Sequence, residues 1–83
     1  MVREKDYVVI FHSIHRVMKA EKCLKAAGCD ILLIPVPRQL AADCGLAIRS
    51  SPAVWENASA LLSREGLDPA EIYQKLEGVY RRI

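Results

Sequence analysis

The sequence lacks the motifs by which many catalytic domains are recognised. It contains no glycine-rich phosphate loop, no G-x-S-x-G and no pair of carboxylates at a defined spacing. Internal repeats, linkers and low-complexity segments are also missing. A chain of 83 residues supports one domain and leaves little room for a deep pocket. We therefore expect a carrier or accessory protein rather than a stand-alone enzyme.

Long apolar runs and a strong charge imbalance are missing too. No run approaches the roughly 20 residues that cross a bilayer, and the charged stretch 1–6 does not resemble a signal peptide. Twelve Lys and Arg oppose ten Asp and Glu, and the positive residues are spread out rather than forming a basic stripe. We expect a cytoplasmic protein that binds neither membrane nor nucleic acid. Homo-oligomerisation stays open, because so small a domain is marginally stable alone.

The chain has only three cysteines, namely Cys23, Cys29 and Cys44. An odd number without an export signal argues against a disulfide framework. No C-x-x-C pair occurs, so the spacing carries no zinc signature. Cys23 lies on the flank of a predicted helix and Cys29 enters a buried strand, so we expect both to pack or to lie incidentally at the surface. We predict free thiols in a reducing compartment.

Hydrophobic periodicity, together with helix-capping residues and turn-forming glycines and prolines, predicts two helices and three strands. In chain order they are strand 7–11, helix 14–27, strand 31–34, strand 46–49 and a helix that starts at Pro52 and stops at Gly66. Ser13 and Ser51 are suited to cap the two helices. Strand 31–34 is apolar on both faces, as a central strand would be.

The stretch 69–77 is ambiguous between helix and strand. Residues 68–71 resemble a capping box that would open a third helix. The element order instead calls for a closing strand near Ile72. With that strand, the order β-α-β-β-α-β predicts an α+β, ferredoxin-like split βαβ domain, with an antiparallel sheet and both helices on one face. We predict a single domain, 1–83, with a core over about 6–76 and a short C-terminal tail.

This topology predicts a site at one end of the sheet. The first and third strands would be antiparallel neighbours, which brings His12 and Ser13 close to Cys44 and Gly45. The N-terminus of the first helix would direct backbone N–H groups and partial positive charge there. Arg38, in the same connection as Cys44, could add a cation. These features favour a thiolate at Cys44, and Gly45 leaves the sulfur accessible.

Other readings of these residues stay open. Cys44 could be a small buried hydrophobe, as free cysteines often are. The adjacent Asp43 would raise the pKa of the Cys44 thiol and oppose the thiolate. His12 and His15 could serve as bases or be ordinary turn residues. Together with Cys44 they could bind a soft metal, although we predict no metal site.

Six segments of the chain together carry a resemblance to a known family: residues 11–15, 19–22, 34–38, 43–49, 65–67 and 72–73. The most specific are a P-x-P-R segment and a Cys-Gly pair that follows it. Over roughly residues 6 to 76 the chain resembles the selenium/sulfur carrier-like protein family. The resemblance implies that Cys44 is the functional residue, with Arg38 in support, and it favours a strand near Ile72.

The resemblance also implies a function. Cys44 would accept sulfur or selenium from a donor such as a cysteine desulfurase, hold it as a persulfide or selenosulfide and pass it to an acceptor protein. No resident cofactor is implied, and the sequence does not distinguish sulfur from selenium. The first alternative is an interaction or regulatory module without covalent chemistry. In that case Trp55 or Tyr80, if exposed, would contribute to the interaction surface. The second is a metal-binding chaperone.

Overall fold

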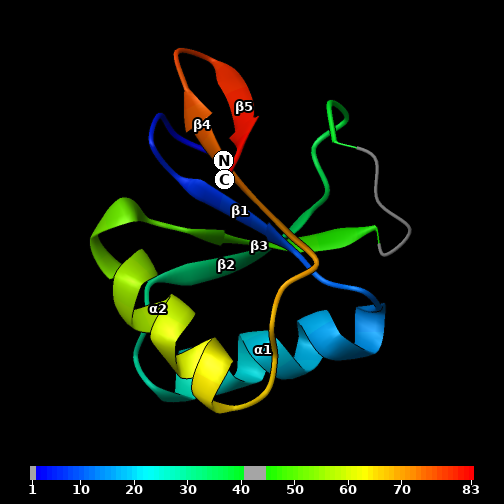
Figure 1. Cartoon of the computed structure of the whole chain (residues 1–83), viewed down its shortest axis with the longest axis vertical. Helices are drawn as coiled ribbons and strands as arrows, with labels where there is room; N and C mark the ends of the chain where they lie inside the picture. Colours follow the sequence, from blue (N-terminus) through cyan, green and yellow to red (C-terminus); the bar gives the residue numbers. More distant parts are fainter. Residues whose placement is uncertain (1, 41–44) are drawn as a thin grey trace.

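A computed structural model of the chain describes residues 2–40 and 45–83. Two helices and five strands are formed within these residues (Figure 1). In chain order they are β1 (Tyr7–Ile10), α1 (Ile14–Ala26), β2 (Ile31–Pro35), β3 (Leu46–Ser50), α2 (Pro52–Arg64), β4 (Glu71–Leu76) and β5 (Val79–Arg82). No helix in this part of the chain is long and apolar enough to cross a membrane.

The strands form one antiparallel sheet in the order β2-β3-β1-β4-β5. β1 pairs with β3, with Val9 opposite Ile48, and with β4, with Val9 opposite Ile72. The predicted α+β, ferredoxin-like split βαβ topology is therefore confirmed, as is the strand near Ile72. β2 lies at the edge of the sheet, so the prediction of a central strand there was wrong.

A fifth strand extends the predicted sheet beyond β4. Residues 77–83 were predicted to be a tail, whereas β4 and β5 form a hairpin there. Glu77 and Gly78 both have positive φ, 53° and 77°, as a tight two-residue hairpin turn requires. The carboxylate of Glu4 accepts hydrogen bonds from the backbone N–H groups of Glu77 and Gly78, which ties this turn to the N-terminal segment.

The two helices begin after serine residues that behave differently. Ser13 Oγ accepts a hydrogen bond from Arg16 N at 3.2 Å, which confirms the predicted cap of α1. Ser51 occupies the corresponding position before α2, but its side chain makes no cap hydrogen bond, so that part of the prediction was wrong. Pro52, with its fixed φ and missing N–H, starts α2 without this side-chain bond.

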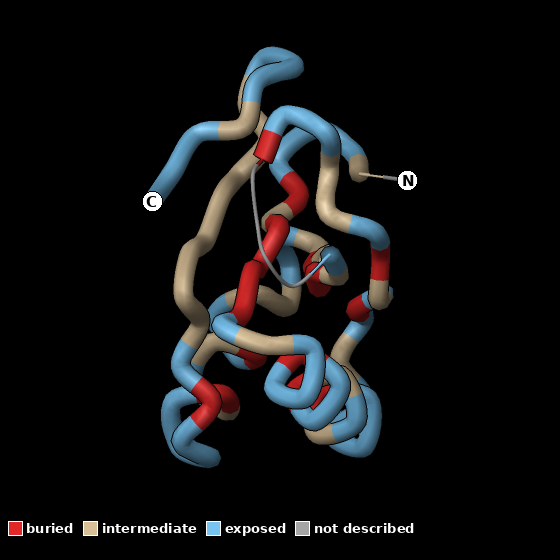
Figure 2. The backbone as a smooth tube through the Cα atoms, turned by 90° about the vertical axis from the view of Figure 1, so that its right-hand side faces the viewer, coloured by how far each residue is buried: buried red, intermediate tan, exposed pale blue. Residues whose placement is uncertain are grey.

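Both helices cover one face of the sheet, as predicted, and the main core lies between the two layers (Figure 1, Figure 2). Val17, Ala20 and Leu24 are the buried residues of α1. Ile14 and Ala27, at the two ends of the predicted helix, are both exposed. The buried members of this core are Val9, Phe11, Val17, Ala20, Leu24, Ile31, Ile48, Ala58, Leu62 and Leu67.

A second apolar cluster covers the opposite face of the sheet. Leu40, from the connection that follows β2, is buried there against strand residues. The buried members of this cluster are Val8, Ile10, Ile34, Leu40 and Ala47. Ile34 is thus buried on this face although β2 is an edge strand, which explains why β2 is apolar on both faces. Figure 1 shows residues 36–40 on the side of the sheet away from the helices.

Candidate functional site

The end of β1 and the start of β3 meet at one end of the sheet. Ile10 pairs with Ala47, and Leu46 pairs with Pro35 of β2. Beyond these pairs, Val36 donates its backbone N–H to the carbonyl oxygen of Gly45 at 3.0 Å. The chain that leaves β1 therefore emerges beside the chain that enters β3, which confirms the neighbouring strands on which the predicted site depends.

The N-terminus of α1 lies at this same end. Only Phe11, His12 and Ser13 separate β1 from the helix, and Figure 1 shows the helix starting near the beginning of β3. Ser13 Oγ accepts a hydrogen bond from the backbone N–H of Arg16. No acidic residue stands in the first turn of α1 to offset the partial positive charge of the helix end. This end of the sheet is therefore suited to stabilise an anion.

Gly45 has a backbone conformation that favours glycine. Its φ is +79°, in the left-handed region, and it is exposed. Apart from its chain neighbours, a Cβ added there would meet no atom of residues 2–40 and 45–83 within 4 Å. The requirement for glycine therefore comes from the backbone turn and not from crowding.

The connection from β2 toward Gly45 is held at two points. Leu40 donates its backbone N–H to the Pro37 carbonyl at 2.9 Å, and its side chain packs in the second cluster. The hydrogen bond between Val36 and Gly45 closes the base of the connection. Arg38 lies in the turn between these points and is exposed. Its side chain is therefore accessible to a ligand or partner.

The predicted nucleophile, Cys44, lies outside the described residues, as do residues 41–43. Its exposure and reactivity stay predictions. His12 and His15 are both exposed. Within residues 2–40 and 45–83, no three His, Cys, Asp or Glu side chains gather as a metal site would require. A metal bound jointly by His12, His15 and Cys44 stays an open alternative, because Cys44 lies outside these residues.

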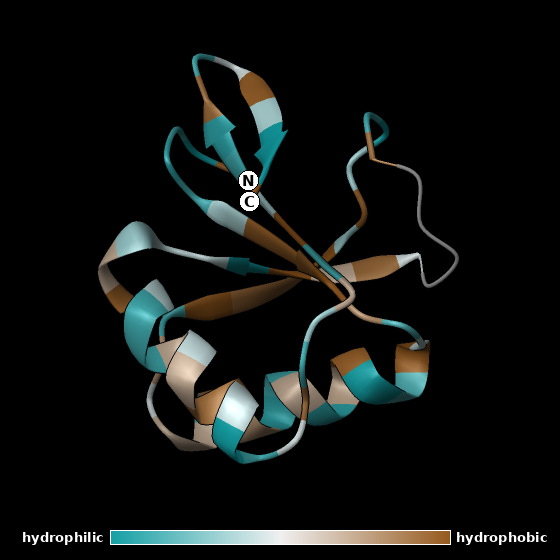
Figure 3. Cartoon of the chain, in the orientation of Figure 1, coloured by the Kyte–Doolittle hydropathy of each residue, from teal (hydrophilic) through white to brown (hydrophobic). Residues whose placement is uncertain are grey.

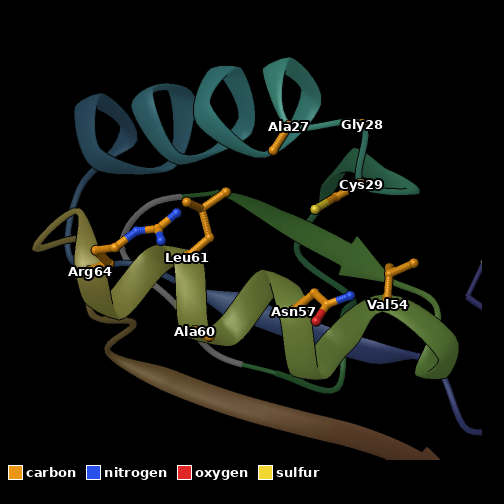
Figure 4. A pocket seen from close by; sticks show the side chains of 8 residues that line it. All are labelled: Ala27, Gly28, Cys29, Val54, Asn57, Ala60, Leu61 and Arg64. Atoms are coloured by element: carbon orange, nitrogen blue, oxygen red, sulfur yellow. The ribbon is translucent and has the colours of Figure 1, made fainter.

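The other two cysteines are free thiols of intermediate burial that pack against the main core, as expected. Cys29 also lines a cavity of about 410 Å³ between the end of α1 and one side of α2. Figure 4 shows its sulfur beside this space, together with the Asn57 amide and the Arg64 guanidinium. Cys29 precedes β2, whereas Gly45 lies beyond the other end of that strand, so this cavity is separate from the candidate site.

A buried ion pair, not predicted from the sequence, lies at the opposite end of the sheet. Asp6 is buried, and its carboxylate accepts from Arg49 Nη1 at 3.3 Å and from the Arg3 backbone at 2.9 Å. Arg49 also reaches Asp30, at 3.4 Å. One sequence signal could have indicated this pair: Arg49 lies in the largely apolar strand β3, which neighbours the buried strand β1. This cluster ties the N-terminal turn to β3 and has a structural role.

Two tyrosines beside the second cluster have altered acidity. A hydrogen bond from Tyr73 to Glu71, at 2.9 Å, raises the pKa of Tyr73, and desolvation and the Glu71 charge add to this. Burial raises the pKa of Tyr80. Both phenols therefore stay protonated at neutral pH, and neither supplies a base.

These features define a small α+β domain whose candidate site is the Gly45 end of the β2–β3 connection, beside the N-terminus of α1. The chain belongs to the family described as "Putative Se/S carrier protein-like", which matches residues 6–74. It is also 33% identical over 79 residues to "Uncharacterized protein YtiA" of Escherichia coli (strain K12), covering 95% of this chain and 89% of that protein. No solved structure gives a significant match.

Proposed function

We propose that this protein is a sulfur or selenium carrier that uses Cys44 as its attachment site. The observation that carries the proposal is the β1–β3 register, in which Ile10 pairs with Ala47. This register brings Gly45, the residue after Cys44, to the end of the sheet where α1 begins. Membership in the selenium/sulfur carrier-like family supports the same function.

Loading would be an exchange between sulfur atoms. The Cys44 thiolate attacks the terminal sulfur of a persulfide on the donor's cysteine. A new S–S bond forms on Cys44 while the donor's S–S bond breaks, and the donor cysteine leaves as a thiolate. The transferred sulfur keeps its proton and its oxidation state, so no external oxidant or reductant is needed. The same exchange with a donor perselenide would leave a selenosulfide on Cys44.

Three features of the described residues support this chemistry. The N–H groups in the first turn of α1, around Ile14 and His15, favour negative charge on a thiolate or persulfide. The exposed guanidinium of Arg38 can pair with the same anion. Gly45 places no side chain next to the attachment point. These effects oppose the negative charge of Asp43 beside the nucleophile.

The sheet register separates Cys29 from this end of the fold. Ile31 of β2 pairs with Ser50, and Leu46 lies four residues back along β3. At roughly 3.3 Å per strand residue, Ile31 is about 13 Å from the level of Leu46. Cys29 lies beyond Ile31, in the direction away from Gly45.

Cys23 is also distant from the candidate site. It lies nine residues beyond Ile14 in α1, which is about 13 Å along a helix that rises roughly 1.5 Å per residue. With both other thiols away from Gly45, we propose that a persulfide on Cys44 is discharged to a second protein. Because persulfide exchange requires reduced thiols, we propose the cytoplasm as its compartment.

The interaction-module alternative relied on exposed aromatic side chains. Trp55 instead stacks on Tyr7, with ring centroids 5.1 Å apart, and packs against the main core. Tyr80 packs against the second cluster. Neither residue offers the exposed anchor that this alternative requires.

The test is to incubate the purified protein with a cysteine desulfurase and cysteine, or selenocysteine, and to record intact and fragment masses. A carrier gains one sulfur or selenium on Cys44. The Cys44→Ser variant gains none, whereas Cys23→Ser and Cys29→Ser gain as much as the wild type. No adduct, or one spread equally over the three cysteines, would contradict the proposal.

A further inference from the structure

The outer face of α1 combines basic and apolar side chains on the helix that starts at the candidate site. Ile14 and Met18 are 54% and 46% exposed, although both are large and apolar. They lie four residues apart and so are neighbours on the helix surface. Lys19 and Lys22 are exposed alongside them. Figure 3 shows hydrophobic and hydrophilic bands alternating along the first turns of this helix.

This face is also slightly hollowed. A shallow depression of about 480 Å³ lies over the exposed side of α1. Its lining consists of His15, Met18, Lys19, Glu21, Lys22 and Lys25. Glu21 already pairs with Lys25 at 3.2 Å. An apolar side chain from a partner could therefore contact Met18 while acidic groups approach Lys19 and Lys22.

The positive charge of the chain is concentrated on this element. α1 contains four Lys and Arg and one Glu, a net charge of +3, whereas the whole chain carries +2. The rest of the molecule is thus slightly negative. Lysines at positions 19, 22 and 25 look dispersed in the sequence, but their spacing of three places them along the exposed side of one helix.

From this arrangement we infer that the outer face of α1 docks the sulfur-donating protein, and that the donor's docking surface is acidic with an apolar anchor. The inference rests on the proposed carrier function, because it concerns the same site. Charge complementarity of this kind mainly accelerates the encounter between partners and orients them. Docking on α1 would place the donor's persulfide beside the end of the sheet that holds Gly45.

The test compares a protein donor with a small donor. Sulfur transfer to Cys44 is measured from a cysteine desulfurase charged with cysteine, and separately from glutathione persulfide, which needs no docking surface. The test variant is Lys19→Glu/Lys22→Glu. The control is Arg64→Glu/Arg81→Glu, which changes the net charge equally at exposed positions outside α1.

Transfer from the desulfurase should fall about tenfold in the test variant at low ionic strength and should be unchanged in the control. The difference should shrink at about 0.5 M salt, where exposed charges are screened. Loading from glutathione persulfide should be the same in all three proteins. Met18→Ala should slow transfer from the desulfurase at every salt concentration, whereas Val79→Ala, at another exposed apolar position, should not.

Other outcomes separate this inference from the proposed function. If glutathione persulfide loads Cys44 but the desulfurase does not, or transfers equally to both charge variants, the docking inference is wrong and the carrier function stands. If neither donor loads Cys44, the carrier function fails and the inference fails with it. Binding to phosphatidylglycerol vesicles or duplex DNA that is lost in Lys19→Glu/Lys22→Glu would assign the face to that partner and overturn the inference.

Discussion

The backbone N–H of Val36 donates to the carbonyl oxygen of Gly45 at 3.0 Å, which closes the connection between β2 and β3 at its base. This hydrogen bond extends the β2–β3 pairing by one step beyond Pro35 and Leu46. It holds Gly45 beside the end of β2, while the pairing of Ile10 with Ala47 brings the start of β3 beside the end of β1. The first turn of α1 begins three residues after β1. A nucleophile that precedes Gly45 is therefore covalently attached to a well-defined part of the fold.

Replacement of Gly45 by alanine tests the backbone requirement at this point. Its φ of +79° costs a residue with a Cβ about 1 kcal/mol, and among the described residues no atom beyond its chain neighbours adds a clash. Gly66→Ala is a matched control, since Gly66 has φ +71° and equally open surroundings. Urea unfolding should show similar losses of stability for both variants. Only Gly45→Ala should slow the reaction of Cys44 with a thiol reagent, and equal slowing by both would contradict the assigned role.

The two helix-capping serines should differ in their contribution to stability. Ser13→Ala removes the hydrogen bond to Arg16 N and should lower the free energy of unfolding by about 1 kcal/mol. Ser51→Ala removes no cap hydrogen bond and should cost clearly less. Urea unfolding of both variants provides the comparison. Equal losses would show that the two helix ends are capped alike.

The Asp6–Arg49 pair gives a larger predicted effect. Asp6→Ala leaves the Arg49 guanidinium, whose side chain is 12% exposed, without its buried partner, and should cost about 3 kcal/mol. Asp30→Ala removes a partner that is 70% exposed and should cost less than about 1 kcal/mol. The two variants make the same chemical change, so their difference measures burial. Comparable losses in urea unfolding would contradict a structural role for the buried pair.

Tyr73 provides a prediction in the alkaline range. Its pKa is raised above the ordinary value of 10.0 by the hydrogen bond to Glu71, so the folded protein holds the phenolic proton more tightly than the unfolded chain. This contribution to stability is complete below pH about 10 and is lost as the pH rises through the raised pKa. Glu71→Gln should lower the pKa of Tyr73 in an absorbance titration, with Tyr73→Phe identifying the signal. Tyr80, whose pKa is raised by burial, should not respond. An unchanged Tyr73 titration would contradict the assigned cause.

Local sequence signals predicted much of the fold. Apolar runs and helix caps identified most of the elements, and their order implied that β1 and β3 are neighbours, as the register confirms. The fifth strand was missed because its turn is Glu77-Gly78 rather than Asn-Gly or Asp-Gly, the usual hairpin signals. The wrong central position of β2 followed from its two apolar faces. The second face is buried by Leu40, a long-range contact that sequence periodicity does not show.

The end of the sheet at which the candidate site lies was also predicted. Ser13 and Gly45 occupy the expected end of the sheet, because strand order and helix start determine their positions. The basic face of α1 was missed, since charges three residues apart gather only when the helix forms. The Asp6–Arg49 pair was missed because its partners lie 43 residues apart in the sequence.

The most direct test of the central claim is the rate at which each of the three cysteines reacts with iodoacetamide from about pH 5 to about pH 9, resolved by fragment mass. The account predicts that Cys44 reacts fastest and that its midpoint lies below about 8.5, the ordinary thiol value. Cys23 and Cys29, which pack against the main core, should react slowly. A Cys44 that reacts no faster than the other two, with a midpoint at or above the ordinary value, would contradict the account.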